Sequence, residues 1–189
     1  MFEQWAALFF EDPWRYRRPP GQLGILYLLR RDINGCLGAE GGMANRHPRQ
    51  IQWPGAMSVF AGVDLLAKFF AGDDGDGVGI RFRAFVTRYF HLPVSEVEAI
   101  YQLRNSMLHS FGLYSRVRNG TVYRFQLVSS GSRPLIRHTP PDHYLVDVIS
   151  LHVDFEKAVR EYEQDVRADS ALQQNFLAMF PNYGAIPIG

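Results

Sequence analysis

The sequence predicts a single, mainly α-helical domain with one inserted β-hairpin, and three observations support this fold class. Apolar residues recur at helical spacing through most of the chain. Only the segment at about 113–128 alternates in the manner of two paired strands. The chain has 189 residues, of which 47% are hydrophobic, so it can bury one sizeable core. Because no repeat or long linker divides the chain, we expect residues 1–189 to fold as one domain.

The N-terminal segment is expected to be an arm followed by a helix. Residues 1–21 contain three prolines, with arginines and aromatic residues between them. This pattern is typical of an arm that its aromatic side chains hold against the core. Residues 22–35 have helical apolar spacing, and Asn34-Gly35 is a signal that would end the helix.

Two further helices are expected before the middle of the chain. The stretch 38–55 contains Gly and Pro without a clear period and is expected to be a loop, followed by a helix over 56–71. Residues 72–79 (GDDGDGVG) resemble a calcium-binding loop only superficially, because the position that requires Glu holds Phe85. We interpret this stretch as a connector to a third helix over 79–90.

A fourth helix is predicted over about 96–111. Pro93 precedes its start, and Ser95 with Glu98 forms the S-x-x-E pattern of a capping box. The hairpin at 113–128 follows directly, with Asn119-Gly120 as a two-residue turn. A two-residue turn at this point would pair Arg116 with Tyr123 and Tyr114 with Phe125.

The C-terminal part is expected to be helical after one more loop. Residues 129–143 are rich in Ser, Gly and Pro, which favours a loop. Residues 144–167 have the four-and-three spacing of a long packed helix. A last short helix over 170–180 would end at Pro181, so 144–180 would hold the C-terminal helices.

Arg104 is unusual because it falls in the middle of the apolar arc of the fourth helix. Val97, Ile100, Leu103 and Met107 belong to the same arc. A guanidinium group is costly to dehydrate without a partner. Arg104 should therefore meet a buried carboxylate, extend to the edge of the core, or lie where a second subunit creates a polar cleft.

Asn105 and His109 are four residues apart, so their side chains are neighbours on the polar face of the same helix. An amide beside an imidazole can hold the ring in one orientation for acid–base chemistry near neutral pH. The other interpretation is a surface histidine bonded to an amide. On a straight helix Arg104 and His109 are about 140° apart. They therefore converge only through helix distortion, the long reach of Arg, or a second chain.

The fourth predicted helix belongs to a stretch of the chain that is basic. Residues 99–141 contain no Asp or Glu, but six arginines and two histidines. In the hairpin, arginines mix with aromatic residues, and such a face can hold phosphates and stack bases. Two other interpretations remain open: the charges prevent edge-to-edge strand pairing, or the hairpin docks on the acidic stretch 142–169. The residues that would contact RNA are Arg116, Arg118, Arg124, Tyr114 and Tyr123.

Metal and cofactor chemistry has little support. His138 and His143 are five residues apart around two prolines, and no second pair has ligand spacing. The lone Cys36 is far away in sequence, and nothing indicates a histidine beside it. We therefore expect neither a metal site nor a cofactor.

The segment LRNSMLHS at 103–110 resembles the signature of the HEPN superfamily. In that superfamily an Arg, usually followed by a polar residue, precedes a His on one helix of an all-α bundle. Arg104-Asn105 followed by His109 matches the common RNxxxH form. The surrounding helical pattern is compatible over most of the chain. The resemblance therefore implies a HEPN-like helical bundle in which the hairpin is an insertion.

The resemblance also implies a function. HEPN domains usually form dimers in which the two motif helices face each other across a cleft. Many are metal-independent ribonucleases, often in toxin–antitoxin, phage-defence or RNA-processing systems. By analogy, His109 would be the general acid or base, Arg104 would hold the scissile phosphate, and Asn105 would orient the cleft. The implied partners are a second copy of the chain, RNA, and an antitoxin protein.

Two alternatives to a ribonuclease remain. Other HEPN proteins lack activity, so the chain could be a non-catalytic module that binds a nucleotide, RNA or a protein partner. It could also be a structural domain in which Arg104 is only ion-paired. Oligomeric state and the effect of substituting His109 distinguish these hypotheses.

Composition favours a cytoplasmic protein without membrane contact. The net charge is +1, so overall charge points to no polyanionic partner. Cys36 is the only cysteine and cannot form an internal disulfide, which suits a reducing compartment. We identify no run of the roughly 18–20 apolar residues that a membrane span needs. The first residues lack the basic start of a secretory signal.

Overall fold

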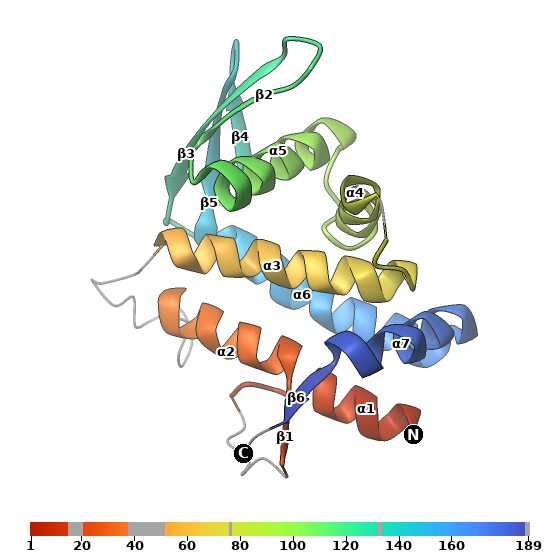
Figure 1. Cartoon of the computed structure of the whole chain (residues 1–189). Coiled ribbons are helices and arrows are strands. Elements are labelled where there is room, and N and C mark those ends of the chain that lie inside the picture. The colour runs from red at the N-terminus through yellow and green to blue at the C-terminus, as the bar shows by residue number, and fades with distance from the viewer. Residues whose placement is uncertain (15–20, 38–51, 76, 132–133, 188–189) are drawn as a thin grey trace.

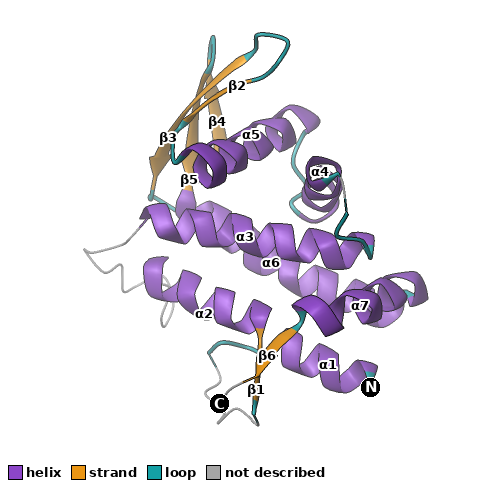
Figure 2. Ribbon diagram, viewed as in Figure 1, coloured by secondary structure: helices purple, strands orange, loops and turns teal. Residues whose placement is uncertain are grey.

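The computed structural model describes residues 1–14, 21–37, 52–75, 77–131 and 134–187. Seven helices and six short strands lie in this part of the chain, so the prediction of a mainly α-helical protein is confirmed (Figure 2). The helices are α1 (Phe2–Phe9), α2 (Ile25–Leu37), α3 (Gln52–Ala71), α4 (Val78–Tyr89), α5 (Val94–Ser110), α6 (Val148–Ala168) and α7 (Ser170–Tyr183). The strands are β1 (Gln22–Gly24), β2 (Tyr114–Arg116), β3 (Val122–Val128), β4 (Ile136–Thr139), β5 (His143–Asp147) and β6 (Ala185–Pro187).

Helix α3 runs through the centre of the helical part, and α2, α4, α6 and α7 all pack against it (Figure 1). Gly62 permits the close approach of α6, because a Cβ at this position would lie 2.6 Å from the ring of Phe155. Length and composition alone would let α3 cross a membrane, although no such segment was expected from the sequence. Of the apolar stretch, 56% is buried inside the fold, and a core helix of a soluble protein meets the same criteria, so this is weak evidence for a span.

The first part of the expected N-terminal arm forms a helix, α1, which the sequence analysis did not predict. The prolines begin only at Pro13, and the residues before them place an apolar side chain on every third or fourth position. Phe9 of this helix is fully buried, with its ring centroid 4.4 Å from that of Phe69 and 5.4 Å from that of Phe176. An aromatic cluster therefore joins α1 to α3 and α7. Residues 15–20 of the expected arm lie outside the described residues.

Several helix ends differ from the prediction because buried side chains continue the helix. Helix α2 begins at Ile25 and passes through Asn34-Gly35 to Leu37, since Asn34 and Leu37 are both buried. Helix α3 begins at Gln52, with Pro54 in the first turn, where its missing N–H leaves no hydrogen bond unmade. Most of the loop expected at 38–55, residues 38–51, lies outside the described residues.

The capping box predicted at Ser95 and Glu98 is wrong. Helix α5 begins at Val94, and the residue at its N-cap is Pro93, which has no side-chain cap. Ser95 therefore lies inside the first turn. Glu98 accepts hydrogen bonds from Arg83 of α4 instead, at 2.6 Å from Nε.

Strands β4 and β5 lie where the sequence predicts a loop over 129–143 and the start of a helix at 144. Strands β2, β3, β5 and β4, in that order, form a mixed sheet at one end of the molecule beside α5 (Figure 2). Strand β5 pairs in parallel with β3 and leads directly into α6, which begins at Val148 rather than at 144. Helix α7 also continues two residues beyond Pro181, to Tyr183, because the buried Phe180 holds its last turn.

Asp147 links the sheet to α6 and supports a first prediction. This buried carboxylate accepts from the backbone N–H of Ser150, as the N-cap of α6, and from the N–H groups of Ser130 and Gly131. Asp147→Ala leaves all three donors without this acceptor, so we expect a loss of about 2 kcal/mol in the free energy of unfolding. Urea unfolding followed by circular dichroism measures the loss, and Asp169→Ala at the more exposed cap of α7 is the comparison and should lose less.

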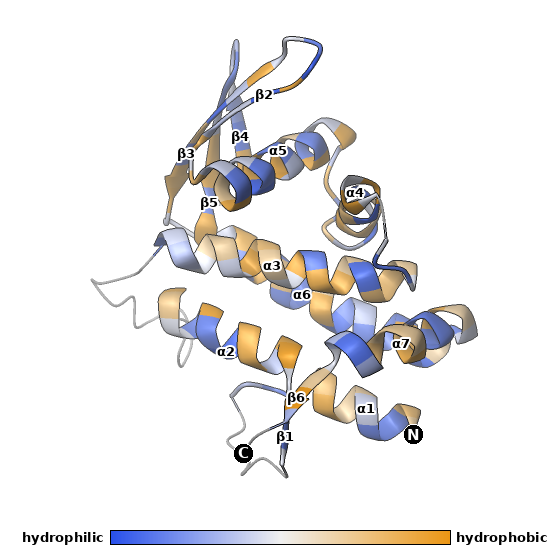
Figure 3. Ribbon diagram, in the orientation of Figure 1, coloured by the Kyte–Doolittle hydropathy of each residue, from blue (hydrophilic) through white to orange (hydrophobic). Residues whose placement is uncertain are grey.

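The predicted two-residue turn of the hairpin is wrong, which shifts its register. The backbone of Val117 donates to Thr121 at 3.0 Å, and Gly120 has φ +89°. The loop therefore has three residues, 118–120, with Gly in the left-handed position. Its hydrophilic tip projects from the molecule (Figure 3). The observed pairs are Tyr114 with Arg124, Ser115 with Tyr123, and Arg116 with Val122.

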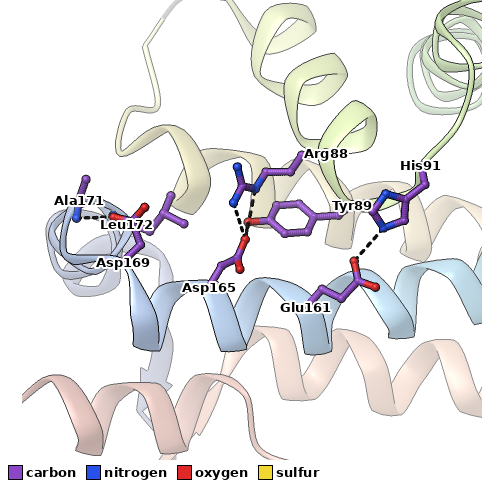
Figure 4. Close-up of polar contacts among 8 residues, drawn as sticks. All are labelled: Arg88, Tyr89, His91, Glu161, Asp165, Asp169, Ala171 and Leu172. Atoms are coloured by element: carbon purple, nitrogen blue, oxygen red, sulfur yellow. Dashed lines mark hydrogen bonds and ion pairs between the residues drawn. The ribbon is translucent and has the colours of Figure 1, made fainter.

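Polar contacts fasten α4 to α6, as Figure 4 shows. The guanidinium of Arg88 donates to Asp165 Oδ2 at 2.7 Å, and the hydroxyl of Tyr89 donates to the same oxygen at 3.0 Å. The hydrogen bonds from Arg88 lower the pKa of Asp165, and the hydrogen bond from Tyr89 lowers it to a smaller extent. At the end of α4, His91 lies 3.0 Å from Glu161 of α6.

The lowered pKa of Asp165 predicts an acid-dependent contribution to stability. The stabilisation is present above the unfolded-state value of about 3.9 and is lost as pH falls through the lower folded-state pKa. Since Arg88 and Asp165 are more than a third exposed, we expect Asp165→Asn to cost only about 0.5–1 kcal/mol at pH 7. The cost should disappear once the pH has fallen below the lowered folded-state pKa of Asp165. A pH series of thermal melts of both proteins checks this, and a pH-independent difference would contradict it.

Candidate functional site

Arg104 of α5 is buried and meets a carboxylate, that of the partly buried Asp64, which corresponds most nearly to the first of the three situations considered for it. The side chain of Arg104 is 9% exposed. Nε donates to Oδ2 of Asp64 on α3 at 2.9 Å, and Nη2 donates to the same oxygen. The apolar arc of α5 packs toward α3, so Arg104 extends across the helix interface to a partner forty residues earlier in the chain.

The remaining nitrogen of Arg104 joins the other two motif residues. Nη1 donates to Oδ1 of Asn105 at 3.0 Å and lies 2.8 Å from Nε2 of His109. The long reach of the guanidinium thus bridges the 140° that separates Arg104 and His109 on an ideal helix. The three motif residues converge within one chain, through Arg104 rather than through a direct contact between Asn105 and His109.

This contact fixes the protonation pattern of His109. A guanidinium group only donates hydrogen bonds, so Nε2 of His109 must be the acceptor. The ring is then neutral, with its proton on Nδ1. In this arrangement the lone pair of Nε2 is engaged by Arg104. A substrate oxygen that replaced Nε2 as the acceptor of Nη1 would free Nε2 to take a proton.

Asp64 is the site residue that the sequence analysis missed. It is the only acidic residue of the long apolar helix α3, and this isolation was the signal that could have identified it. Burial raises the pKa of Asp64, and the hydrogen bond and charge of Arg104 act in the opposite direction. Its Oδ1 atom is buried without a hydrogen-bond partner. Asp64 therefore orients Arg104 and neutralises part of its charge.

A hollow of 570 Å³ opens on the His109 side of Arg104, between α5 and β2. The exposed ring of His109 lies in its lining together with the amide of Asn105. Among the described residues that line it, none is acidic, which suits an anionic ligand. The lining residues are Tyr101, Asn105, Ser106, His109, Ser110, Tyr114, Ser115 and Arg116.

A chain of hydrogen bonds attaches the wall of this hollow to the helices. The hydroxyl of Ser115 on β2 donates to Oε1 of Gln102 at 2.6 Å, and Nε2 of Gln102 donates to Glu98 at 2.7 Å. Glu98 in turn accepts from Arg83 of α4. Gln102 is only 5% exposed, so this part of the polar face of α5 is covered by the hairpin rather than by solvent. We name this series Arg83–Glu98–Gln102–Ser115 the bracing chain.

A second, smaller hollow of 250 Å³ lies on the other side of Arg104. Asp64 and Arg104 contribute to it from the ion pair, and Lys68 and Arg81 add two further cations. Arg81 donates to the carbonyl of Gly75 at 2.7 Å, and this hydrogen bond also holds the connector before α4. Positive charge therefore surrounds Arg104 on both sides.

The structure brings together some of the residues proposed to contact RNA and separates others. Tyr114 and Arg116 line the hollow of His109. Arg118 is exposed in the hairpin loop, and Arg124 is ion-paired with Asp142. Tyr123 is buried in the sheet, with its ring 5.4 Å from that of Tyr144. Of the five residues proposed to contact RNA, Tyr114 and Arg116 are therefore the two that share a surface with the motif.

No group of three or more His, Cys, Asp or Glu side chains suited to a metal ion occurs in the described part of the chain. His138 stacks on Tyr144 at 4.5 Å, and His143 lies 2.9 Å from Asp142. The pKa of Cys36 is raised by burial and by the nearby charge of Asp32, which opposes formation of a thiolate.

Comparisons with known proteins found no match, whether with a family model, a curated protein or a solved structure. The functional assignment therefore depends on the residues of the site.

Proposed function

We propose that the protein is a HEPN-like, metal-independent endoribonuclease that acts as a homodimer. The observation that carries the proposal is the 2.8 Å contact between Nη1 of Arg104 and Nε2 of His109. This contact lies beside a hollow whose described lining contains no acidic residue. An anion-binding group and a proton acceptor are thus adjacent, as cleavage of a phosphodiester next to a 2′-hydroxyl requires.

The proposed reaction starts when a phosphate oxygen of RNA replaces Nε2 of His109 as the acceptor of Nη1. The freed Nε2 takes the proton of the 2′-hydroxyl, and the 2′ oxygen attacks the phosphorus. The bond to the 5′ oxygen breaks, and the ring of His109 gives the proton it has just taken to that oxygen, which restores the neutral ring. The products are a 2′,3′-cyclic phosphate and a free 5′-hydroxyl. Asn105 keeps Nη1 directed toward the phosphate throughout.

A non-catalytic binding module is the second candidate, and one observation favours it. Arg104 is already paired with Asp64, and its last nitrogen satisfies both Asn105 and His109. A site with these bonds can hold a nucleotide, RNA or an antitoxin-like protein without reacting. Such a module would bind RNA and leave it intact.

The test is incubation of the purified protein with total RNA in excess EDTA. The proposal predicts cleavage, with 2′,3′-cyclic phosphates at the new ends, and no cleavage of 2′-O-methyl RNA, which lacks the attacking hydroxyl. Ultracentrifugation under the same conditions should show a dimer. RNA that is bound but intact would favour the binding module, whereas a monomer that binds no RNA would favour a structural role for Arg104.

A further inference from the structure

Tyr101 is the first residue of α5 that lines the hollow, about 12 Å along the helix from His109. Its ring contacts α4, which packs beside α5 (Figure 1). The guanidinium of Arg83 on α4 lies 3.7 Å from the centre of this ring, and the ring of Phe82 lies 5.7 Å from it, centre to centre. Side chains of α4 therefore hold Tyr101 in place from outside the hollow.

The first turn of α4 leaves room for both the phenol and the guanidinium. A Cβ at Gly79 would lie 2.5 Å from the hydroxyl oxygen of Tyr101 and 2.8 Å from Nη1 of Arg83, so a larger residue would displace them. Nη1 of Arg83 also donates to the carbonyl of Gly79 at 3.1 Å. Glycine at this position thus permits the contact between Arg83 and Tyr101.

The same guanidinium is the first member of the bracing chain. Nε of Arg83 donates to Oε2 of Glu98 at 2.6 Å, and Nη2 donates to Oε1 at 3.1 Å. Gln102 continues the series from Glu98 to Ser115 of β2, which lines the hollow. Arg83 itself does not line the hollow. One side chain outside the hollow is therefore connected to both the Tyr101 end and the β2 wall.

Arginine suits this double role better than lysine. Its guanidinium is planar, so its edge donates two parallel hydrogen bonds to a carboxylate while its face covers an aromatic ring. Arg83 uses its three nitrogens for Glu98 and Gly79, and its face for Tyr101. At 37% exposure, its side chain is too exposed for the ion pair to contribute much to stability. The contacts of Arg83 therefore indicate a role in positioning rather than in folding.

We propose that Arg83 is a positioning residue that holds the Tyr101 end and the β2 wall of the hollow in one arrangement, the one that binds the ligand. This inference rests on the proposed function, which supplies RNA as the ligand, and extends it by a residue that acts on the site from another helix. Without Arg83, Glu98 loses the bonds that orient it toward Gln102, and the ring of Tyr101 loses its cover.

The first measurement is amide hydrogen exchange in the unmodified chain and in Arg83→Lys. Lysine keeps the charge but loses both the fork and the stacking on Tyr101. We expect the amides of β2 to exchange about threefold faster, because partly exposed ion pairs and cation–π contacts are each weak. Strand β5 lies on the other side of β3 and outside the bracing chain, so its exchange rates should not change.

Two further variants show whether Arg83 acts through the bracing chain. Ser115→Ala breaks the series at its other end and should also speed the exchange of β2. In the double variant, Arg83→Lys should then add little, whereas independent effects would add. Arg88→Lys is the matched control: Arg88 is on the same helix, donates to Asp165 and lies 5.4 Å from the centre of the Tyr89 ring, but does not line the hollow. It should leave β2 unchanged.

The second measurement is the affinity for a labelled, single-stranded 2′-O-methyl oligonucleotide, which the proposed reaction cannot cleave. The affinity should fall about threefold in Arg83→Lys and not in Arg88→Lys. Tyr101→Leu removes the ring that Arg83 covers, so Arg83→Lys should cost less affinity in this background than in the unmodified chain.

Unchanged exchange of β2 in Arg83→Lys would overturn the proposal. Faster exchange with unchanged affinity would overturn it too, as would additive effects of Arg83→Lys and Ser115→Ala. No binding and no cleavage of RNA by the unmodified chain would overturn the proposed function. In that case the exchange data would still decide whether Arg83 positions the β2 wall.

Discussion

We expect His109→Ala to lower the rate of RNA cleavage by about 10²–10⁴-fold, the range that positioned acid–base groups contribute. The affinity for RNA should change little, because Arg104 and Arg116 still present their charges to the phosphates. His109 is exposed, so its loss should cost the fold less than about 1 kcal/mol. Initial rates with end-labelled RNA in EDTA, together with melting temperatures, measure these effects.

His138→Ala is the matched control for this experiment. His138 is an exposed histidine on β4, outside the lining of the hollow, and its substitution should leave the rate unchanged. Full activity of His109→Ala would end the catalytic proposal. Equal losses in both variants would point to a general effect of histidine removal on the fold.

The largest effect on stability should come from Arg104→Ala. This change leaves the partly buried carboxylate of Asp64 with neither oxygen hydrogen-bonded by a side chain of the described residues. Breaking a buried ion pair at one partner costs about 3–5 kcal/mol, which we expect as the loss in the free energy of unfolding. Urea unfolding at pH 7 measures it.

The same variant should show a characteristic pH dependence. Burial already raises the pKa of Asp64, and removing Arg104 removes the bond and charge that oppose this rise. A carboxyl group with a raised folded-state pKa destabilises the fold above that pKa and ceases to do so as it becomes protonated. The loss in Arg104→Ala should therefore shrink as pH falls toward the carboxyl range, and a loss that grows on acidification would contradict this account.

A double variant separates the structural role of Arg104 from its chemical role. Arg104→Met combined with Asp64→Leu replaces the ion pair by apolar side chains, and such replacements are often neutral for stability. We expect this protein to fold and to have lost RNA cleavage. A folded double variant that still cleaves RNA would show that Arg104 serves only as half of an ion pair.

The sequence predicts the motif because its parts are local. Arg104, Asn105 and His109 lie within six positions of one helix, so periodicity places Asn105 and His109 on one face, and the reach of Arg104 was one of the three ways considered for it to join them. Asp64 could not be found in this way, because its contact with Arg104 depends on how α3 and α5 pack. The sequence shows that a buried arginine needs an acid, but it does not show which acid.

The errors in the sheet have local causes. Asn119-Gly120 fits a two-residue turn and also a three-residue loop, because both place glycine at positive φ. Strand β5 runs into α6 without a turn residue, so its apolar residues continue the helical pattern that follows. Asp147, as a good N-cap residue, was the available signal for the true start of α6.

The bracing chain has a consequence for how this protein can diversify. Arg83, Glu98, Gln102 and Ser115 fix the base of the hairpin to α4 and α5, while residues 118–120 at its tip take no part in this series. The β2 wall of the hollow is therefore held against the helices by side-chain hydrogen bonds. If the protein acts on RNA as proposed, substitutions at the tip can change which RNA approaches without displacing His109 or Arg104. Selection for a new target and preservation of the reacting groups then act on separate residues, so the two properties can evolve independently.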